Sequence, residues 1–238
     1  MPLRIGFDMD GVLADFSGAF REHAIRLFGP SMLDAVKSEG GDQRKSTDDP
    51  EEEEERQAKA EVEALRESRR REDEVWEAIE STPNFWTTLK PLDERAVPRI
   101  HELMLRHRWE VFFITQRPFT AGETVQRQTQ RWLVAQGFDL PSVLVIGGSR
   151  GAAAAAVRLD YHVDDSPQNC LDIVSDSRAR PILIVPEPDP VTEATAKHLQ
   201  IAMARSIAEA LDILEHTVDG RGPRGGVLDK LSRIVGRK

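Results

Sequence analysis

The sequence of 238 residues has only one cysteine, one tyrosine and no apolar run near the length of a membrane span. A single cysteine, Cys170, cannot form a disulfide within the chain, so we expect a reducing, cytoplasmic environment. A helix that crosses a bilayer needs about 20 consecutive apolar residues, so we expect no transmembrane segment. Residues 1–4 lead directly into a strand-like run, which indicates no secretory leader. The sequence therefore predicts a globular protein without disulfides.

Positive charge is also scarce. Lys and Arg together number 32 against 41 Asp and Glu, which gives a net charge of −9. Residues 37–74 hold 15 acidic and 9 basic residues, whereas residues 221–238 hold 6 basic residues and 1 acidic residue. An acidic body lacks the broad basic surface that binds a phosphate backbone, so nucleic acid is not the expected partner. An anionic ligand would have to be bound by a local cation.

The glycine patterns of the common nucleotide-binding loops are missing as well. Gly147-Gly148-Ser149-Arg150-Gly151 fits neither the Walker pattern nor the dinucleotide fingerprint, which disfavours a nucleotide-triphosphate motor and a dehydrogenase. Arg150 in this cluster is either an anion ligand or an exposed loop residue, and both interpretations stay open.

What the sequence does contain is an alternation of strand-like apolar runs and helical patterns. Helix starts are indicated by a capping box at Thr120–Glu123, by Ser166-Pro167 and by Ser206–Glu209. Strands that alternate with helices predict a three-layer, Rossmann-like α/β fold with an open, mainly parallel sheet. The five expected strands cover residues 3–7, 111–114, 143–146, 161–163 and 182–185.

A long segment without a convincing strand separates the first expected strand from the second. We predict an α/β core of residues 1–15 and 90–218, a helical cap inserted at 16–89, and a linker with a basic tail at 219–238. Within the cap we expect a flexible acidic loop at about 37–55, because runs of like charge repel one another. The cap aromatic residues Trp76, Phe85 and Trp86 either form its core, the commoner situation, or stack on a substrate base.

Polar residues follow three of the expected strands. Asp8 and Asp10 come directly after the first, Thr115 ends the second, and Asp164-Asp165 ends another. Each of these alone fits an ordinary turn or helix cap. The carboxyl ends of parallel strands meet at one edge of a sheet, however, where ligands bind. We therefore expect these side chains to converge on one crevice.

Four carboxylates in one crevice call for a cation. Two unit charges about 4 Å apart repel by about 4 kcal/mol at an effective dielectric constant near 20. Oxygen ligands without His or Cys nearby select Mg²⁺, which commonly completes its shell with substrate phosphate. Thr115 and Arg150 are the candidate phosphate donors. The pattern thus predicts a magnesium site that binds a small phosphorylated substrate.

The sequence resembles a known family at these positions. Asp8–Val12, the strand that ends in Thr115, and Asp164-Asp165 are similar to the signature motifs of the haloacid dehalogenase-like (HAD) hydrolase superfamily. A narrower resemblance is to the 5′(3′)-deoxyribonucleotidase branch. It is carried by Asp8–Asp15, Phe85-Trp86, Leu89-Lys90-Pro91, Ile114–Pro118 and His162–Asp165.

The resemblance implies a Mg²⁺-dependent phosphatase with a covalent aspartyl-phosphate. Asp8 would be the nucleophile, and Asp10 would act as general acid and then as general base. Mg²⁺ would bind Asp8, the Asp10 carbonyl and an acid of the pair Asp164 and Asp165. The cap would close over the site and select the leaving group.

The resemblance also implies phosphate ligands. Thr115 and Gln116 would bind phosphoryl oxygens, and Arg150 stands where the family usually has a lysine. The first hypothesis is a phosphatase for a nucleoside monophosphate or a similar ester. The alternatives are a non-catalytic phosphate-binding or regulatory module, and a phosphatase for nucleic-acid ends tethered by the basic tail. The sequence predicts no oligomeric state.

Overall fold

The computed structural model describes residues 2–30 and 50–219. A six-stranded sheet forms its centre, with the strand order β3-β2-β1-β4-β5-β6 and parallel pairing throughout. The strands are β1 (Arg4–Phe7), β2 (Glu110–Thr115), β3 (Ser142–Val145), β4 (Tyr161–Asp164), β5 (Arg180–Ile184) and β6 (Ala202–Ala204). The chain leaves β1 towards β2 and β3, then returns to β4 on the other side of β1. This places a topological switch point between β1 and β4.

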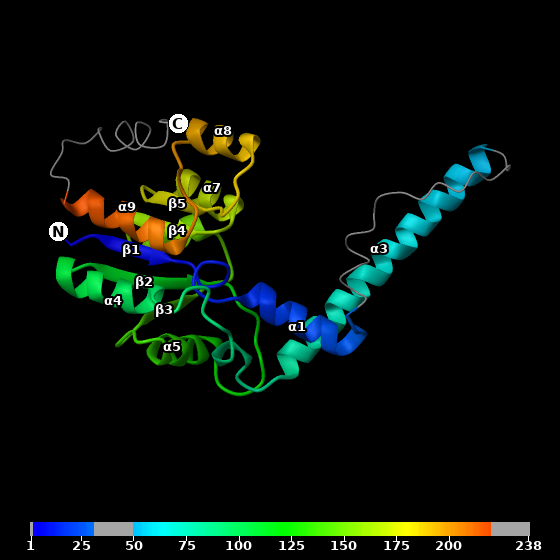
Figure 1. Cartoon of the computed structure of the whole chain (residues 1–238), viewed down its shortest axis with the longest axis horizontal. Coiled ribbons are helices and arrows are strands. Elements are labelled where there is room, and N and C mark those ends of the chain that lie inside the picture. Colours follow the sequence, from blue (N-terminus) through cyan, green and yellow to red (C-terminus); the bar gives the residue numbers. More distant parts are fainter. Residues whose placement is uncertain (1, 31–49, 220–238) are drawn as a thin grey trace.

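Helices cover both faces of this sheet (Figure 1). On one face lie α4 (Ala96–His107), α5 (Val125–Ala135) and α9 (Ile207–Asp219). On the other lie α6 (Arg150–Ala156), α7 (Pro167–Asp176) and α8 (Pro190–His198). The predicted three-layer, Rossmann-like α/β fold is therefore confirmed.

The strands are apolar because each is covered on both sides. On β2, Phe113 packs in the large core with Trp132 of α5, while its neighbour Ile114 packs with Ala154 and Ile173 of the opposite layer. Successive side chains of a strand point to opposite faces. A strand buried on both faces therefore reads as a continuous apolar run.

The sequence patterns located most of these elements. Ser166 and Ser206 cap α7 and α9 as predicted, since their hydroxyl oxygens accept bonds from the amides of Asn169 and Glu209. All five expected strands are present. The sixth, β6, was missed because Ala202–Ala204 is too short and too weakly apolar to stand out.

The predicted capping box at Thr120–Glu123 is wrong. α5 begins four residues later, and the Thr124 hydroxyl accepts a hydrogen bond from the amide of Arg127 at 3.4 Å. Thr120 is buried instead and bonds the side-chain amide of Gln128. Burial of this polar pair outweighed the local capping pattern.

The described part of the insert after β1 is helical, as predicted. It holds α1 (Phe16–Phe28), α3 (Pro50–Ser81) and the short 3₁₀ helix η1 (Phe85–Thr87). Figure 1 shows α3 projecting away from the sheet. The flexible loop predicted at about 37–55 is wrong for residues 50–55, which are helical, because Glu-rich sequence favours a helix. The rest of that loop and the tail 220–238 lie outside the described residues, and the core and cap boundaries stay a prediction.

An aromatic cluster joins this insert to the sheet. The Phe16 ring stacks on Trp76 at 5.3 Å and lies 5.6 Å from the Trp86 ring. Phe85 and Trp86 are each only 1% exposed. The core interpretation is confirmed for Phe85 and Trp86, because neither offers a free ring face to a substrate base, whereas Trp76 is only partly buried against the same core.

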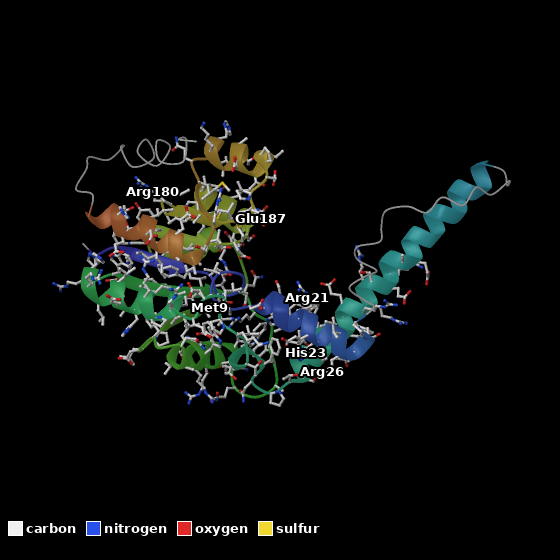
Figure 2. All side chains as sticks on the ribbon, in the orientation of Figure 1. Met9, Arg21, His23, Arg26, Arg180 and Glu187 are labelled. Atoms are coloured by element: carbon white, nitrogen blue, oxygen red, sulfur yellow. The ribbon has the colours of Figure 1, made fainter. Side chains whose placement is uncertain are left out.

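The loop that leads from β1 into this cluster is also anchored by burial. Met9 is completely buried (Figure 2), and its carbonyl accepts hydrogen bonds from the amides of Leu13 and Ala14 at 2.9 and 2.8 Å. These bonds close a tight turn directly after Asp8. Among the helices of residues 2–30 and 50–219, none has the length and apolar character of a membrane span.

Candidate functional site

Three neighbouring strands end at the predicted crevice. β1 lies between β2 and β4, and its last residue, Phe7, is paired with Phe113 on one side and Val163 on the other. Asp8 directly follows β1, and its amide donates to the carbonyl of Val163 at 2.9 Å. Asp164 is the next position along β4 after Val163, and Thr115 lies two positions beyond Phe113 at the end of β2. The sheet register therefore places these polar side chains at one edge.

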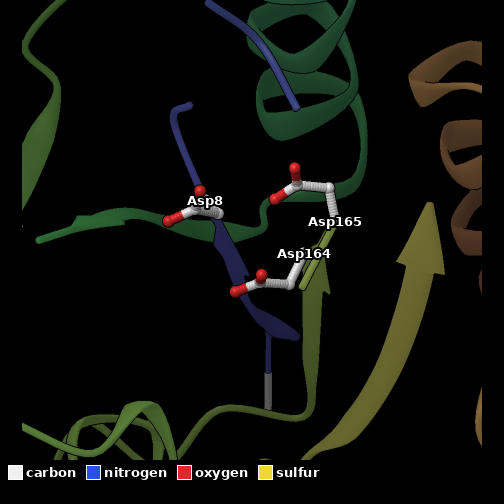
Figure 3. A group of neighbouring side chains, drawn as sticks. All are labelled: Asp8, Asp164 and Asp165. Carbon is white, nitrogen blue, oxygen red and sulfur yellow. The ribbon is translucent and has the colours of Figure 1, made fainter. Parts of the chain in front are cut away.

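Three carboxylates meet there. One oxygen from each of Asp8, Asp164 and Asp165 lies within 4.8 Å of the other two. Figure 3 shows the three side chains, one from the end of β1 and two from the end of β4, gathered around a common space. Asp8 and Asp164 are buried, whereas Asp165 is exposed. The predicted convergence of these three acids is confirmed.

A glycine lets the two chain segments approach each other. Gly11 has φ +81°, and a Cβ at this position would overlap the carboxylate of Asp165. Its amide donates to the carbonyl of Ala14 at 3.1 Å, within the turn after β1. Only glycine meets both the backbone conformation and the close contact without strain.

The crowding of these acids opposes their ionisation. Burial, followed by the negative charge of Asp164, raises the pKa of Asp8 well above its usual range, and the nearby Arg150 compensates only in part. Burial and the charge of Asp164 also raise the pKa of Asp165 to about 6. Two of the three carboxylates therefore bind a proton more readily than an isolated aspartate.

Asp164 differs because its neighbours favour its charge. Its burial opposes ionisation, but bonds from His162, the Ser166 amide and Asn169 outweigh burial and lower the pKa of Asp164. The distances are 3.0 Å to His162 Nε2, 3.0 Å to the Ser166 amide and 3.0 Å to Asn169 Nδ2. These three groups fix the orientation of this buried carboxylate.

The three carboxylates fit a divalent cation. All the donors are hard oxygen atoms, which Mg²⁺ prefers. A cation among them would offset the mutual repulsion that, after burial, contributes most to the raised pKa of Asp8 and Asp165. The residues present are therefore suited to hold Mg²⁺, and metal binding stays a prediction.

Arg150 lies inside this site. It is the first residue of α6, its side chain is 6% exposed, and Nη2 donates a hydrogen bond to Asp8 Oδ1. Nε lies 3.5 Å from Asp164 Oδ2, and the buried Nη1 has no hydrogen-bond partner among the described residues. An exposed loop residue is therefore the wrong interpretation of Arg150. Its free donor favours the alternative, an anion ligand.

The Asp10 carboxylate does not join the three-acid cluster. It forms a double ion pair with Arg117, whose Nε and Nη2 donate to Oδ2 and Oδ1 at 2.8 and 2.6 Å. Sequence reasoning missed Arg117 as a site residue, although it follows the end of β2 by two positions. The Asp10 carboxylate, expected in the crevice with the other three acids, is paired with Arg117. Metal binding by the Asp10 carbonyl stays a prediction.

The predicted phosphate ligands on β2 lie at the same edge. Thr115 ends the strand and is buried, and its carbonyl accepts a hydrogen bond from the amide of Ile146 at 2.9 Å. Gln116 follows it and is exposed. The positions suit contact with a ligand in the crevice, and both phosphate-binding roles stay predictions.

Comparison with known proteins gives a likeness of fold. No protein-family model matches the sequence, and no curated protein matches it. The structure is similar to that of a putative beta-phosphoglucomutase from Thermotoga maritima, with 15% identity, a TM-score of 0.52, and coverage of 90% of this chain and 99% of that chain. A haloacid dehalogenase-like family hydrolase from Streptococcus pneumoniae aligns with 10% identity, a TM-score of 0.49, and coverage of 90% and 98%.

At this level of identity, the first of these likenesses concerns the fold alone. It agrees with the three-layer α/β fold that the HAD resemblance implies. The narrower nucleotidase resemblance is not tested by it and stays a prediction.

Proposed function

We propose that this protein is a Mg²⁺-dependent phosphomonoester hydrolase that uses Asp8 as its nucleophile. The observation that carries the proposal is the convergence of Asp8, Asp164 and Asp165, with the free guanidinium donor of Arg150 beside Asp8. Such a site combines a carboxylate nucleophile, a cation-binding group and an anion ligand. These are the components that phosphoryl transfer needs.

Each residue of the site has a defined task in this reaction. The Asp8 carboxylate attacks phosphorus and forms an aspartyl-phosphate, while the leaving alcohol takes a proton from Asp10. Water then attacks the same phosphorus and gives a proton to Asp10, which releases inorganic phosphate and restores Asp8. Arg150 and Thr115 bind the phosphoryl oxygens throughout.

Asp8, Asp164 and Asp165 would hold the metal. Bound Mg²⁺ supplies positive charge that offsets the negative charge of the transferred phosphoryl group. His162 and Asn169 keep Asp164 in place for this role. Burial and the charge of Asp164 raise the pKa of Asp8, so a bound cation would favour its charged, nucleophilic form.

We propose small phosphate esters as the substrate class, with nucleoside monophosphates as the first to be tested. The motif resemblance to the nucleotidase branch supports this choice. The buried Trp86 gives it no further support, because Arg117 and the aromatic cluster cover its ring.

The test is phosphate release from p-nitrophenyl phosphate and from a panel of nucleoside monophosphates, with and without Mg²⁺. Asp8→Asn is the matched control because it removes the nucleophile and keeps the size of the side chain. We expect metal-dependent release by the wild type that exceeds the release by the variant at least 100-fold, on the order of the loss of a catalytic nucleophile. Equal release by both proteins would contradict the proposal.

One observation favours a second candidate, a phosphate-binding module without turnover. Both acids that the reaction needs are ion-paired to arginines, Asp8 to Arg150 and Asp10 to Arg117. If these pairs persist in the presence of ligand, the site would bind phosphate and not cleave its ester. Mg²⁺-dependent binding of inorganic phosphate, without any release from the ester panel, would identify this function.

A further inference from the structure

Arg117 is a buried charged side chain to which the reaction above gives no task. Its side chain is 0% exposed, and its hydrogen bonds go to specific side chains. Two nitrogens donate to Asp10, and Nη1 donates to the Thr129 hydroxyl at 2.9 Å. The guanidinium also lies over the Trp86 ring, 4.6 Å from its centre. A side chain held from several sides has little freedom to move.

This rigidity is passed on to Asp10. A double hydrogen bond between a guanidinium and a carboxylate fixes the plane of the carboxylate as well as its distance. The Asp10 side chain is still 24% exposed, so one side of it faces Arg117 and another remains open. Arg117 thus orients a charged carboxylate whose free side can meet water or a ligand.

The supports of Arg117 come from two separate parts of the chain. Thr129 lies on α5, and its hydroxyl donates to the Val125 carbonyl at 2.8 Å, so it accepts the bond from Arg117. Trp86 belongs to the insert, and its Nε1 donates to the Pro118 carbonyl at 3.1 Å. The insert and α5 therefore hold Arg117 together.

We propose that Arg117 is a positioning residue that holds Asp10 as the general base for hydrolysis of the aspartyl-phosphate, an inference that rests on the proposed function. In this step, the oxygen of water forms a bond to phosphorus and the bond from phosphorus to Asp8 breaks. The electron pair of that bond returns to the Asp8 carboxylate. The proton of the water goes to the Asp10 carboxylate, whose orientation is fixed by its double hydrogen bond to Arg117.

The experiment separates the two halves of the reaction with p-nitrophenyl phosphate. Its leaving group needs no general acid, so the first burst of p-nitrophenol reports attack by Asp8, and the later steady rate reports hydrolysis of the intermediate. For Arg117→Met we expect a burst of one p-nitrophenol per active site at nearly the wild-type rate. The steady rate should fall about 10- to 100-fold, which is part of the roughly 10²- to 10⁴-fold contribution of a general base, because Asp10 remains but is no longer oriented. Mass spectrometry of acid-quenched protein should show the phosphorylated chain.

Two further variants make the result specific. Arg117→Lys keeps the charge without the two-pronged geometry, so its steady rate should lie between the wild type and Arg117→Met. If Arg117→Met does not fold, Arg117→Lys carries the comparison. Arg127→Met is the control on α5, because Arg127 is 68% exposed and only pairs with Glu123 on the surface. Its burst and steady rates should equal those of the wild type.

The outcomes distinguish this inference from the function on which it rests. If the burst and the steady rate fall by the same factor, or neither falls, Arg117 does not position the base and the inference is wrong. If the wild type releases no more p-nitrophenol than Asp8→Asn, the proposed function itself fails, and the inference fails with it.

Discussion

Gly11 lies against the carboxylate of Asp165, so closely that no other residue fits at position 11 without moving that acid. The contact joins the turn after β1 to the end of β4. It therefore ties the backbone beside the proposed nucleophile Asp8 to a proposed metal ligand more than 150 residues away in the chain. This relationship makes the proposed metal site sensitive to a single methyl group.

Gly11→Ala should weaken Mg²⁺ binding by about 10- to 100-fold, the usual cost of disturbing the neighbours of a metal ligand. The positive φ of +81° should add a loss of about 1 kcal/mol in the free energy of unfolding. The measurement is the rise in melting temperature with increasing MgCl₂ concentration.

Gly29→Ala is the matched control for this variant. Gly29 has a similar φ of +82°, and a Cβ there would have no neighbour within 4 Å. Its loss of stability should be similar, with unchanged Mg²⁺ affinity. Equal Mg²⁺ affinities for the two variants would contradict the role that we give to the Gly11 contact.

Asp165→Asn should stabilise the metal-free protein above about pH 6. The pKa of Asp165 is about 6 in the folded chain and near 3.8 when unperturbed, so the folded state binds the proton more tightly. The wild type therefore loses stability relative to the variant as pH rises from about 4 to 6. Below pH 4 both side chains are neutral in both states, and the difference should disappear.

We expect a gain in melting temperature of about 2–4 °C at pH 7.5 in EDTA, the shift that about 1 kcal/mol produces in a chain of this size. Partial exposure of Asp165 limits the gain through solvent screening. Saturating Mg²⁺ should reverse the order, because only the wild type keeps the third carboxylate. A variant that is less stable than the wild type in EDTA at pH 7.5 would contradict the acidic repulsion.

Arg150→Met should weaken the binding of inorganic phosphate by about 10- to 100-fold, the value of one or two hydrogen bonds to a charged group. The measurement is competitive inhibition of p-nitrophenyl phosphate hydrolysis by phosphate. Arg178→Met serves as the control, because Arg178 is exposed in the loop after α7. An unchanged inhibition constant in Arg150→Met would show that its free donor does not face the substrate.

Trp86→Phe should lower the free energy of unfolding by about 1–3 kcal/mol. The change removes the indole that donates to the Pro118 carbonyl and leaves a gap in a closely packed cluster. The ratio of KM values for a nucleoside monophosphate and p-nitrophenyl phosphate should stay constant, because the ring is covered. A change in that ratio, measured at equal fold content, would show instead that Trp86 contacts the base.

The patterns that worked in sequence analysis are local or repeat along the chain. The caps at Ser166 and Ser206 act within a few residues. The strands at 111–114 and 182–185 are short continuous apolar runs. The capping box at Thr120 failed because Gln128 offered its hydroxyl a buried partner instead. β6 was missed because its three residues gain their stability from pairing with β5, which the sequence of the strand does not reveal.

The same difference between local patterns and contacts made by the fold applies to the site. The order of the acids and the parallel sheet were enough to predict that Asp8 and Asp164 meet, since strand ends of one sheet share an edge. Arg117 could not be found in this way. An arginine after a strand is usually exposed, and its burial against Asp10 and Trp86 depends on how the insert packs.

Residue identity along the chain thus determined the α/β layering, the convergence of the acidic strand ends at one edge and the oxygen-only ligand chemistry. Only the tertiary structure decided which arginine binds which acid. It also decided that the ring of Trp86 is covered by its neighbours. The physical reason is that alternation and capping operate over a few residues. The environment of a buried charge, in contrast, is made by side chains from segments far apart, whose distances exist only after folding.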